Sequence, residues 1–522
     1  MTKKRTGLLL AATAAILLSG CAAQARLVIL SGSENQTLEP LLKEFSSKNG
    51  IDVQMKYSGS VDIMLELQKG AASYDAVWPA SSLWISLGDT ARKVKLAQSI
   101  WASPVVFGIR MSKARDLGFI GKEVHVRDIL AAIKQKKLTF AMTSASQSNS
   151  GASAYLGFLY ALLGNPDVMT LDDLSKPGLK DQIRAFLSGI NRSSGSSGWL
   201  KDLFLQSDYD AMVNYEALII EANQALVQSG KEPLYVVYPV DGIAMADSTL
   251  GYVNNGDQRK EDAFRKLQAF LLSDDTQKRI AALGRRTGIG GVTATLDPLV
   301  FKPEWGIDTA RILSPIRIPS ADVMRESLRL YQTEFRKPSL TVYCLDYSGS
   351  MSGAGSQQLK AAMGILLDPG KSREFLLQPG SEDLTVVIPF SSSILDTWQQ
   401  KGNDPQSLAA LLERITRLAP TGGTDIYSPV IAGMDFMAGL PNLDKYVPAV
   451  ILMTDGQSNT GMTLDSLKDE VQKVGKDIPV FCIMFGDASE RQLDAIAELT
   501  RARVFDGRKD LVTAFRNVKG YN

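Results

Sequence analysis

Short apolar runs alternate with longer amphipathic segments along residues 26–335. The first apolar run is followed by a Ser/Gly turn and then by Leu38, Leu41, Leu42 and Phe45, which fall at helical spacing. A second apolar run comes next, and the same order returns in LTFAMTSASQSNSGASAYLGFLYALLG and in PLYVVYPVDGIAMADS. Strands that alternate with helices predict an α/β fold with a largely parallel sheet, whose ligand-binding loops lie at the carboxyl ends of the strands.

The alternation restarts after a boundary near residues 330–340, where charged residues and Pro338 precede a new apolar run. The expected strands are LTVYCLD, LTVVIPFS, PAVILMTD, PVFCIMFG and ARVFDG, with helical patterns between them. Nearly continuous apolar strands indicate a parallel sheet that is covered on both faces. The sequence therefore predicts two units, at residues 26–335 and 336–522, the second being a doubly wound (Rossmann-like) domain.

The first residues have the pattern of an export signal, with a basic start, a short apolar run and then LSGC at positions 18–21. LSGC resembles the bacterial lipobox, which implies a lipoprotein signal peptide at 1–20, a lipidated Cys21 and a tether at 21–25. Acyl chains such as palmitate would anchor the protein, since each buried CH₂ contributes about 0.8 kcal/mol. The alternative is ordinary cleavage within CAAQA.

Export would deliver the chain to the cell envelope, lipid-anchored and extracytoplasmic. Ala22 after the cysteine is typical of the type held at the outer membrane, facing the periplasm, if the cell has an outer membrane. In other cells the expected place is the outer face of the cell membrane. No later stretch is long and apolar enough to predict a second membrane segment.

Composition excludes several kinds of chemistry. The net charge of +1 gives no global field that would draw in nucleic acid. His125 is the single histidine, so a multi-histidine metal centre cannot form, and its position before an expected helix favours a loop residue. Cys344 and Cys482 lie in apolar runs, which favours buried free thiols over a disulfide between them.

The first unit resembles bacterial extracellular solute-binding proteins. The features that carry the resemblance are the SGSEN turn, YDAVWPAS, SPVVFGIR and the YPVDG return. The resemblance implies a periplasmic-binding-protein-like fold of two α/β lobes, joined by a hinge and closing over a small molecule.

Serine-rich turns precede many of the expected helices of this unit. Such serines cap helices, and helix starts that cluster at a cleft can also hold a polar or anionic ligand; the two roles are compatible. The candidate solute-binding residues are Ser33, Ser60, Ser81, Ser103, Ser150, Ser194, Tyr238 and Asp241.

The stretch CLDYSGSMSG, residues 344–353, carries the clearest chemistry of the second unit. It lacks the G-x-S-x-G of a hydrolase nucleophile, the phosphate loop G-x-x-x-x-G-K-[ST], and the second aspartate of an aspartyl phosphotransferase. Asp346, Ser348 and Ser350 instead offer oxygen atoms at a strand end, and Thr424 in PTGGTD and Asp455 in ILMTDG offer two more. A few hard oxygen ligands with retained water suit Mg²⁺.

With these residues the second unit resembles a von Willebrand factor A domain with a metal-ion-dependent adhesion site (MIDAS), whose pattern is D-x-S-x-S, a distant threonine and a later aspartate. The resemblance implies that Ser348 and Ser350 bind Mg²⁺ or Mn²⁺ directly, and Thr424 directly or through water. It implies that Asp346 and Asp455 act largely through bridging water. One coordination position is left for an acidic side chain of a protein partner.

The hypothesis from the sequence is a membrane-anchored extracytoplasmic binding protein, and not an enzyme. Its A domain would bind a protein partner through the metal, beside a domain for a small polar or anionic solute. One alternative is a solute receptor of a membrane transport system, docked through its A domain. A metal-assisted hydrolase is disfavoured, because no histidine or paired carboxylate is left to act as a general base.

Overall fold

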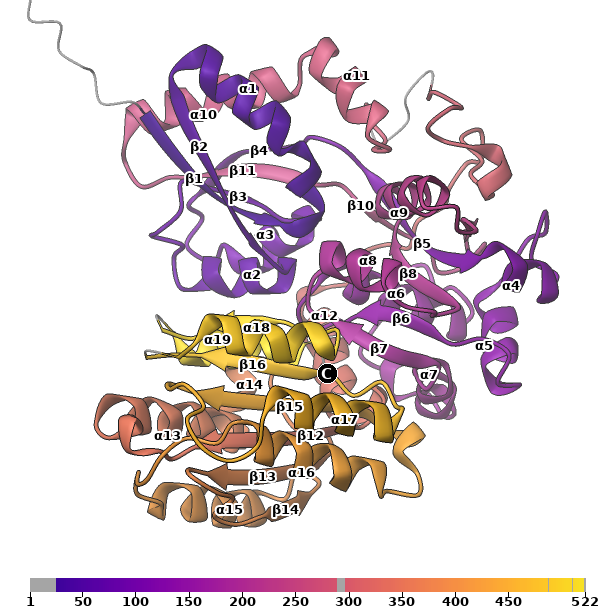
Figure 1. Cartoon of the computed structure of the whole chain (residues 1–522). Helices are drawn as coiled ribbons and strands as arrows, with labels where there is room; N and C mark the ends of the chain where they lie inside the picture. The colour runs from indigo at the N-terminus through magenta and orange to yellow at the C-terminus, as the bar shows by residue number, and fades with distance from the viewer. Residues whose placement is uncertain (1–24, 289–295, 487, 509, 521–522) are drawn as a thin grey trace, which may run out of the picture.

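The computed structural model describes residues 25–288, 296–486, 488–508 and 510–520, and the segment that holds the expected signal peptide and Cys21 lies outside them. Three β-sheets, each with helices on both faces, build the chain (Figure 1). The α/β class expected from the sequence is confirmed, with two lobes preceding a separate doubly wound sheet. None of the described helices combines the length and the apolar character needed to cross a membrane.

The first lobe contains a five-stranded sheet with the order β2-β1-β3-β11-β4. Its strands are β1 (Ala25–Gly32), β2 (Ile51–Ser58), β3 (Ala76–Trp78), β4 (Val94–Ser99) and β11 (Thr249–Val253), and its helices are η1 (Ser33–Leu38), α1 (Glu39–Asn49), α2 (Ser60–Gln68), α3 (Ser82–Gly88), α10 (Gln258–Leu271) and α11 (Asp274–Ala282). Leu27 and Ile29 of β1 pack with α1 and α10, whereas Leu30 packs with α2 and α3. This alternation follows from the two-residue repeat of a strand.

The second lobe contains a six-stranded sheet with the order β10-β5-β8-β6-β7, and β9 pairs with β5. Its strands are β5 (Ser103–Arg110), β6 (Phe140–Thr143), β7 (Ile190–Ser194), β8 (Ala211–Tyr215), β9 (Leu234–Val237) and β10 (Ala244–Ala246), and its helices are α4 (Met111–Asp116), α5 (Val126–Lys134), α6 (Asn149–Leu162), α7 (Leu179–Leu187), α8 (Ser197–Leu205) and α9 (Glu216–Gln228).

The expectation of a largely parallel sheet holds for five of the six strands of this lobe, and β5 is the exception, because it runs antiparallel to β8, β9 and β10. In the first lobe β11 likewise runs antiparallel to β3 and β4. Both exceptions have the same cause. The chain crosses between the lobes from β4 to β5 and from β10 to β11, so that β5 and β11 enter their sheets from the opposite lobe.

A helical connection leads from the lobes to the third sheet. It consists of α12 (Ala321–Leu330) and the π-helical turn Tyr331–Phe335, and Met324, Leu328 and Phe335 pack into the core of the second lobe. Short 3₁₀ turns lie at Asp173–Ser175, Pro303–Trp305, Gly349–Met351 and Leu443–Lys445.

The third sheet has the order β14-β13-β12-β15-β16-β17, and β14 is the one antiparallel strand among those described. Its strands are β12 (Ser339–Asp346), β13 (Leu384–Phe390), β14 (Trp398–Lys401), β15 (Val447–Thr454), β16 (Val480–Met484) and β17 (Val504–Asp506), and its helices are α13 (Ala354–Leu366), α14 (Pro369–Glu374), α15 (Pro405–Arg417), α16 (Tyr427–Ala438), α17 (Leu464–Val474), α18 (Glu490–Leu499) and α19 (Leu511–Lys519).

Central strand β12 is buried along its whole length. Tyr343 and Leu345 pack toward α13, α15 and α19, whereas Val342 and Cys344 pack toward α16, α17 and α18. The thiols of Cys344 and Cys482 are free and buried, as the sequence favoured. Both belong to the same apolar cluster, and β15 lies between their strands, since Cys344 aligns with Leu452 and Leu452 with Cys482.

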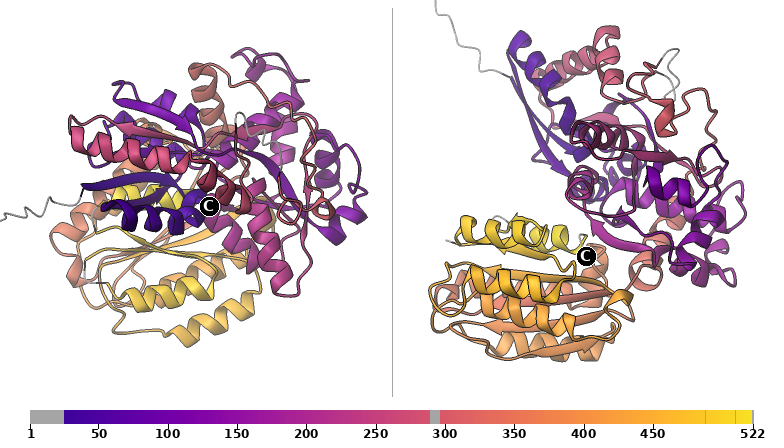
Figure 2. Two further views of the ribbon diagram at one scale, coloured as in Figure 1. Left: turned by 90° about the horizontal axis from the view of Figure 1, so that it is seen from above. Right: turned by 45° about the vertical axis from the view of Figure 1, so that its right-hand side comes forward.

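Helix α19 and strand β17 face the two lobes (Figures 1 and 2). Arg516 of α19 is buried there, and its guanidinium pairs with Asp62 of the first lobe at 2.6 Å. The same guanidinium donates to the carbonyl of Ser146 in the second lobe at 3.1 Å and to the carbonyl of Phe375 in its own unit. One side chain therefore joins both lobes to the third sheet.

Replacing Arg516 should release the third sheet from the lobes. Arg516→Ala leaves the partly buried Asp62 carboxylate without its cation, and breaking such a pair costs at most roughly 3–5 kcal/mol, the value for a fully buried pair. We expect a larger radius of gyration in small-angle X-ray scattering and faster proteolysis within residues 331–338. Arg508→Ala is the matched control, because Arg508 is exposed and pairs with Asp506 beside it. Wild-type scattering from the Arg516 variant would show that other contacts hold the sheet in place.

Candidate functional site

The D-x-S-x-S motif lies at the carboxyl edge of the third sheet. Asp346 ends β12, and Asp455 directly follows the neighbouring parallel strand β15. Parallel neighbours end at the same edge, so the two carboxylates, more than 100 positions apart in the chain, come together. Ser348 and Ser350 belong to the turn that leads from β12 toward α13.

Hydrogen bonds connect the four residues. The Ser348 N–H donates to Asp346 Oδ1 at 2.7 Å, and the Ser350 hydroxyl donates to Asp455 Oδ1 at 2.8 Å. The two serine hydroxyl oxygens lie 3.0 Å apart. Ser348 is buried and Ser350 is exposed, so the cluster reaches from the sheet edge to the surface.

The fifth predicted residue, Thr424, reaches the same place from the loop before α16. A Cβ on Gly456 would lie 3.4 Å from both Ser350 Oγ and Thr424 Oγ1, so both hydroxyls lie beside Gly456. The structure thus brings together all five residues that the sequence singled out. Three hydroxyls and two carboxylates are oxygen donors suited to a hard divalent cation.

Three further residues hold this cluster, and the sequence analysis missed them. Thr454 donates its hydroxyl to Asp346 Oδ2 at 2.6 Å. The Asn459 side chain accepts from the N–H of Thr424 at 3.1 Å, and buried Asp425 accepts from the N–H groups that start α16. Thr454 and Asp425 directly adjoin Asp455 and Thr424 in the chain, a signal that could have marked two of the three.

The electrostatics of the cluster favour a cation. Burial raises the pKa of Asp346, and the neighbouring Asp455 carboxylate raises it further. Among the described residues no group of three or more histidine, cysteine, aspartate or glutamate side chains is placed to hold a metal. A cation bound at the sheet edge would therefore meet mainly neutral hydroxyls.

Of the eight candidate solute-binding residues, Ser33 is the one that lines a described cavity between the lobes. It bridges the lobes, because its hydroxyl oxygen accepts from the Ser196 hydroxyl at 2.8 Å and from the Gly198 N–H at 3.0 Å.

The other seven candidates make hydrogen bonds within the protein. Ser60 accepts from Ala80 N, Ser81 from Leu83 N and Ser103 from Ala217 N; Ser150 contacts Ser197 and Thr143; Ser194 donates to Ser196 O; Tyr238 donates to Glu216; Asp241 accepts from Val126 N and faces His125. These seven residues therefore have the structural role, such as helix capping, that was considered from the sequence beside ligand binding.

The lobes are in direct contact at the middle of their interface. Trp84 of the first lobe donates its indole N–H to Asn149 Oδ1 of the second at 2.7 Å, and Asn149 donates to the Tyr215 hydroxyl at 3.1 Å. The Val61 N–H donates to the Gln147 carbonyl at 3.0 Å. Val61, Met64 and Trp84 also join the apolar core of the second lobe, so this conformation is closed.

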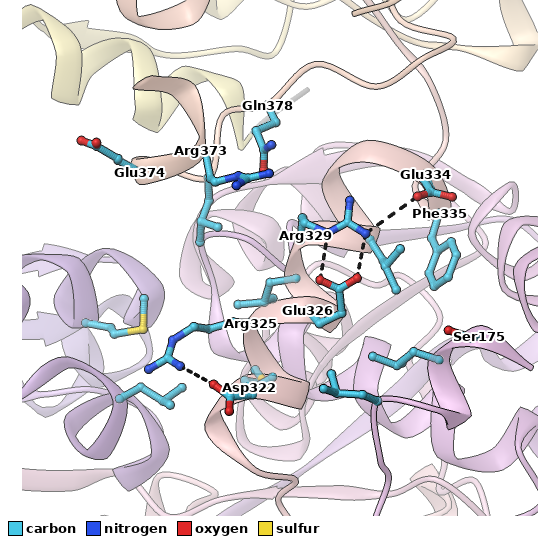
Figure 3. Close-up of a pocket in the computed structure, with 18 of the residues that line it drawn as sticks. Ser175, Asp322, Arg325, Glu326, Arg329, Glu334, Phe335, Arg373, Glu374 and Gln378 are labelled. Carbon is cyan, nitrogen blue, oxygen red and sulfur yellow. Dashed lines mark hydrogen bonds and ion pairs between the residues drawn. The ribbon is translucent and has the colours of Figure 1, made fainter. Parts of the chain in front are cut away.

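The described residues line two sizeable cavities around the closed lobes. The larger, about 1170 Å³, lies between α2, the loop before α7, α12 and α14 (Figure 3). Its charges are largely paired with one another, as in Arg325 with Asp322 and Arg329 with Glu326. The smaller, about 390 Å³, lies where both lobes meet β17 and α19.

Glu34, at the start of η1, is a buried carboxyl beside the interface. It is 3% exposed, and its Oε1 has no hydrogen-bond partner among the described residues. Burial raises its pKa to about 7, although a hydrogen bond from its own backbone N–H and the guanidinium of Arg285 act in the opposite direction. Its carboxylate folds back over Gly32, where a Cβ would lie 1.9 Å from Oε1, so a larger residue at that position would displace the Glu34 side chain.

Comparisons with known families divide the chain in the same way. Residues 27–286 match the model of the bacterial extracellular solute-binding proteins, and residues 342–514 match that of the von Willebrand factor type A domain. The human inter-alpha-trypsin inhibitor heavy chain H6 is 24% identical over 161 residues, which make up 28% of this chain. The chain spans 11% of the length of that relative.

Solved structures resemble one unit or the other. The sulfate-binding protein SubI from Mycobacterium tuberculosis H37Rv is 17% identical, and the similarity covers 56% of this chain and 92% of SubI with a TM-score of 0.38. The periplasmic binding protein AfuA from Actinobacillus pleuropneumoniae is 14% identical, and the similarity covers 60% of this chain and 99% of AfuA with a TM-score of 0.43. A von Willebrand factor type A protein from Catenulispora acidiphila is 20% identical, and the similarity covers 36% of this chain and 43% of that protein with a TM-score of 0.30.

Replacing Glu34 by glutamine should stabilise the fold at high pH. Because burial raises the pKa, the carboxyl favours folding fully below its unfolded value of 4.5, and this contribution is lost as the pH rises through about 7. Glu34→Gln avoids ionisation and should gain on the order of 3 kcal/mol in free energy of unfolding at pH 8. Urea unfolding of wild type and variant at pH 4 and pH 8 measures the difference, with exposed Glu123→Gln as control. An equal difference at the two pH values would contradict the assigned cause.

Proposed function

We propose that this chain, which joins a bacterial extracellular solute-binding domain to a von Willebrand factor type A domain, is an extracytoplasmic binding protein that captures a protein partner through a divalent cation. The observation that carries the proposal is the convergence of Asp346, Ser348, Ser350, Thr424 and Asp455 at one sheet edge. The same five residues form the complete MIDAS pattern of the resembling family.

The donor set gives the proposed site its selectivity. The hydroxyls of Ser348, Ser350 and Thr424 would bind Mg²⁺ or Mn²⁺, and Asp346 and Asp455 would hold its water molecules. Two carboxylates and three neutral hydroxyls leave a bound cation with unsatisfied attraction for another anion, especially where an interface excludes water. An acidic side chain of the partner would satisfy it, so metal and partner should bind together more tightly than either binds alone.

We infer binding and not turnover as the activity of this edge. The two carboxylates nearest the proposed cation are engaged by Ser348, Thr454 and Ser350. His125, the single histidine, starts α5 in the second lobe and contacts Asp241. A general base would have to come from elsewhere.

The contact between α19 and the lobes weighs against a simple transport receptor. Arg516 and its neighbours cover the side on which the smaller cavity lies. A permease that took solute from the lobes would first have to displace the A domain. We therefore favour a protein that uses both domains together for binding.

The metal proposal predicts a loss of partner capture when Asp346 is replaced. Asp346→Ala removes one carboxylate and the acceptor of two hydrogen bonds, so partner recovered from membrane extracts should fall at least tenfold, and chelator should reproduce the loss on wild type. Crosslinking and mass spectrometry of captured proteins measure it, with circular dichroism as a check on folding. Ca²⁺ should restore binding poorly, because it prefers more ligands in a larger shell.

Asp396→Ala is the matched control, since Asp396 is an exposed carboxylate in the loop before β14. It should leave capture unchanged. Partner that is recovered equally well with Asp346→Ala and in chelator would rule out the metal bridge.

The anchor proposal rests on LSGC at the end of the basic and apolar leader. Cys21→Ser removes the thiol that would be acylated, and the protein should move from the membrane fraction to the soluble or unprocessed fraction. Fractionation in the native host and mass spectrometry of the N-terminus measure this shift. Unchanged fractionation, together with an N-terminus that carries no lipid in the wild type, would refute lipidation.

A further inference from the structure

The smaller cavity is built by all three parts of the chain. We refer to it as the junction cavity, and its volume is about 390 Å³. Tyr57 from the end of β2, Trp199 from α8, and Phe505 and Asn517 from β17 and α19 all line it. Its volume falls within the range of about 300–1,000 Å³ that is usual for small-molecule sites.

Three aromatic residues contribute to its wall. Tyr57, Trp199 and Phe505 each come from a different part of the chain. The Arg503 guanidinium carbon lies 5.8 Å from the centre of the Trp199 ring and 5.7 Å from that of Phe505, so it ties the second lobe to β17. These contacts hold the two rings in place, and Arg503, which also lines the cavity, adds hydrogen-bond donors to the wall.

The charges and hydrogen bonds around the cavity disfavour an anion. Helices α2 and α8 both start here, but the Val61 N–H already donates to Gln147 and the Gly198 N–H to Ser33. These two donors are therefore not free for a phosphate or sulfate. The carboxylates of Asp62 and Asp202 line the cavity together with one cation, the Arg503 guanidinium, so the lining carries no excess of positive charge that would favour an anion.

Neutral hydrogen-bonding groups are left for a ligand. Gln36 and Asn517 line the cavity from opposite domains, and in the part of the chain that the structure describes neither side-chain amide has a hydrogen-bond partner. An amide offers both donors and acceptors, which suits hydroxyl groups. The hydroxyls of Ser58 and Ser196 lie in the same wall.

We propose that the junction cavity binds a neutral polyhydroxylated molecule of the size of a mono- or disaccharide. The C–H faces of a sugar ring would pack on the aromatic rings, and its hydroxyls would bond to the amides and serines. This inference narrows the polar or anionic solute expected from the sequence, and it rests on the proposed function only in that the chain is a binding protein.

Because the lobes and the A domain both line the junction cavity, ligand binding is coupled to docking of the A domain on the lobes. Phe505 and Asn517 complete the wall only while α19 is docked on the lobes. A ligand that contacts both sides binds the docked form more tightly, and by reciprocity it stabilises docking. The solute would thus strengthen the contact that Arg516 makes.

Isothermal titration calorimetry of the full chain tests the proposal. The neutral probes are glucose, galactose, xylose, trehalose and maltose, and the anionic probes are glucose 6-phosphate, phosphate and sulfate, each up to 10 mM. At least one neutral sugar should bind with a Kd below 1 mM. Gln36→Ala and Asn517→Ala should each weaken it at least tenfold, whereas exposed Gln472→Ala on α17 should not.

Chelator separates this inference from the metal site. Chelator on the wild-type chain should leave sugar affinity unchanged, so failure of the metal proposal would not affect this result. Binding of the anions but of no neutral sugar would overturn the proposed ligand class. Absence of binding by every probe would overturn the site itself, and so would a neutral sugar whose affinity is insensitive to both Gln36→Ala and Asn517→Ala.

Discussion

The arrangement of the lobes and the third sheet depends on hydrogen bonds made by one buried guanidinium, that of Arg516. Arg516 is 5% exposed, and a buried charge is tolerated only when it is paired and hydrogen-bonded. Its acceptors are Asp62 of the first lobe, Ser146 of the second and Phe375 of the third unit. Because no single unit supplies all three, the charge is satisfied only when the lobes are closed and α19 rests on them. The junction cavity lies beside this contact, since Asp62 also lines it.

Regular apolar patterning made much of the fold predictable. The strands β12, β13, β15, β16 and β17 follow from near-continuous apolar runs, since both faces of a covered parallel sheet are buried. Strand β14 was not predicted, because an edge strand with the sequence WQQK carries no apolar repeat. The antiparallel direction of β5 and β11 was not predicted, for another reason. Direction depends on where the chain crosses between lobes, and apolar runs do not record that.

The candidate metal site and the candidate solute-binding residues differ in how far the sequence could define them. The candidate metal ligands lie at or near expected strand ends, as in the motif from Asp346 to Ser350 and at Asp455. Because β12 and β15 are parallel neighbours, their carboxyl ends meet at one edge of the sheet, where Thr424 joins them. Serines at helix starts look alike whether they cap a helix or face a ligand. Ser81 caps α3, whereas Ser33 accepts a hydrogen bond from Gly198 of the other lobe. The contact of Ser33 depends on the closed arrangement of the lobes, which the sequence pattern does not indicate. Arg516 gave no signal at all, because its partners lie more than 100 positions away.

The two buried thiols have a consequence for how such a chain would mature. Cys344 and Cys482 sit on strands separated by β15, which sets their Cα atoms about 10 Å apart, beyond the roughly 7 Å that a disulfide can span. Burial raises the pKa of both thiols well above the usual range, which suppresses the reactive thiolate. In an oxidising extracytoplasmic compartment, the location proposed for this chain, the unfolded chain would still expose both sulfurs. During maturation, folding of the third sheet would then compete with oxidation of the two thiols. Once the sheet has formed, the separation of Cys344 and Cys482 by β15 prevents a disulfide between them.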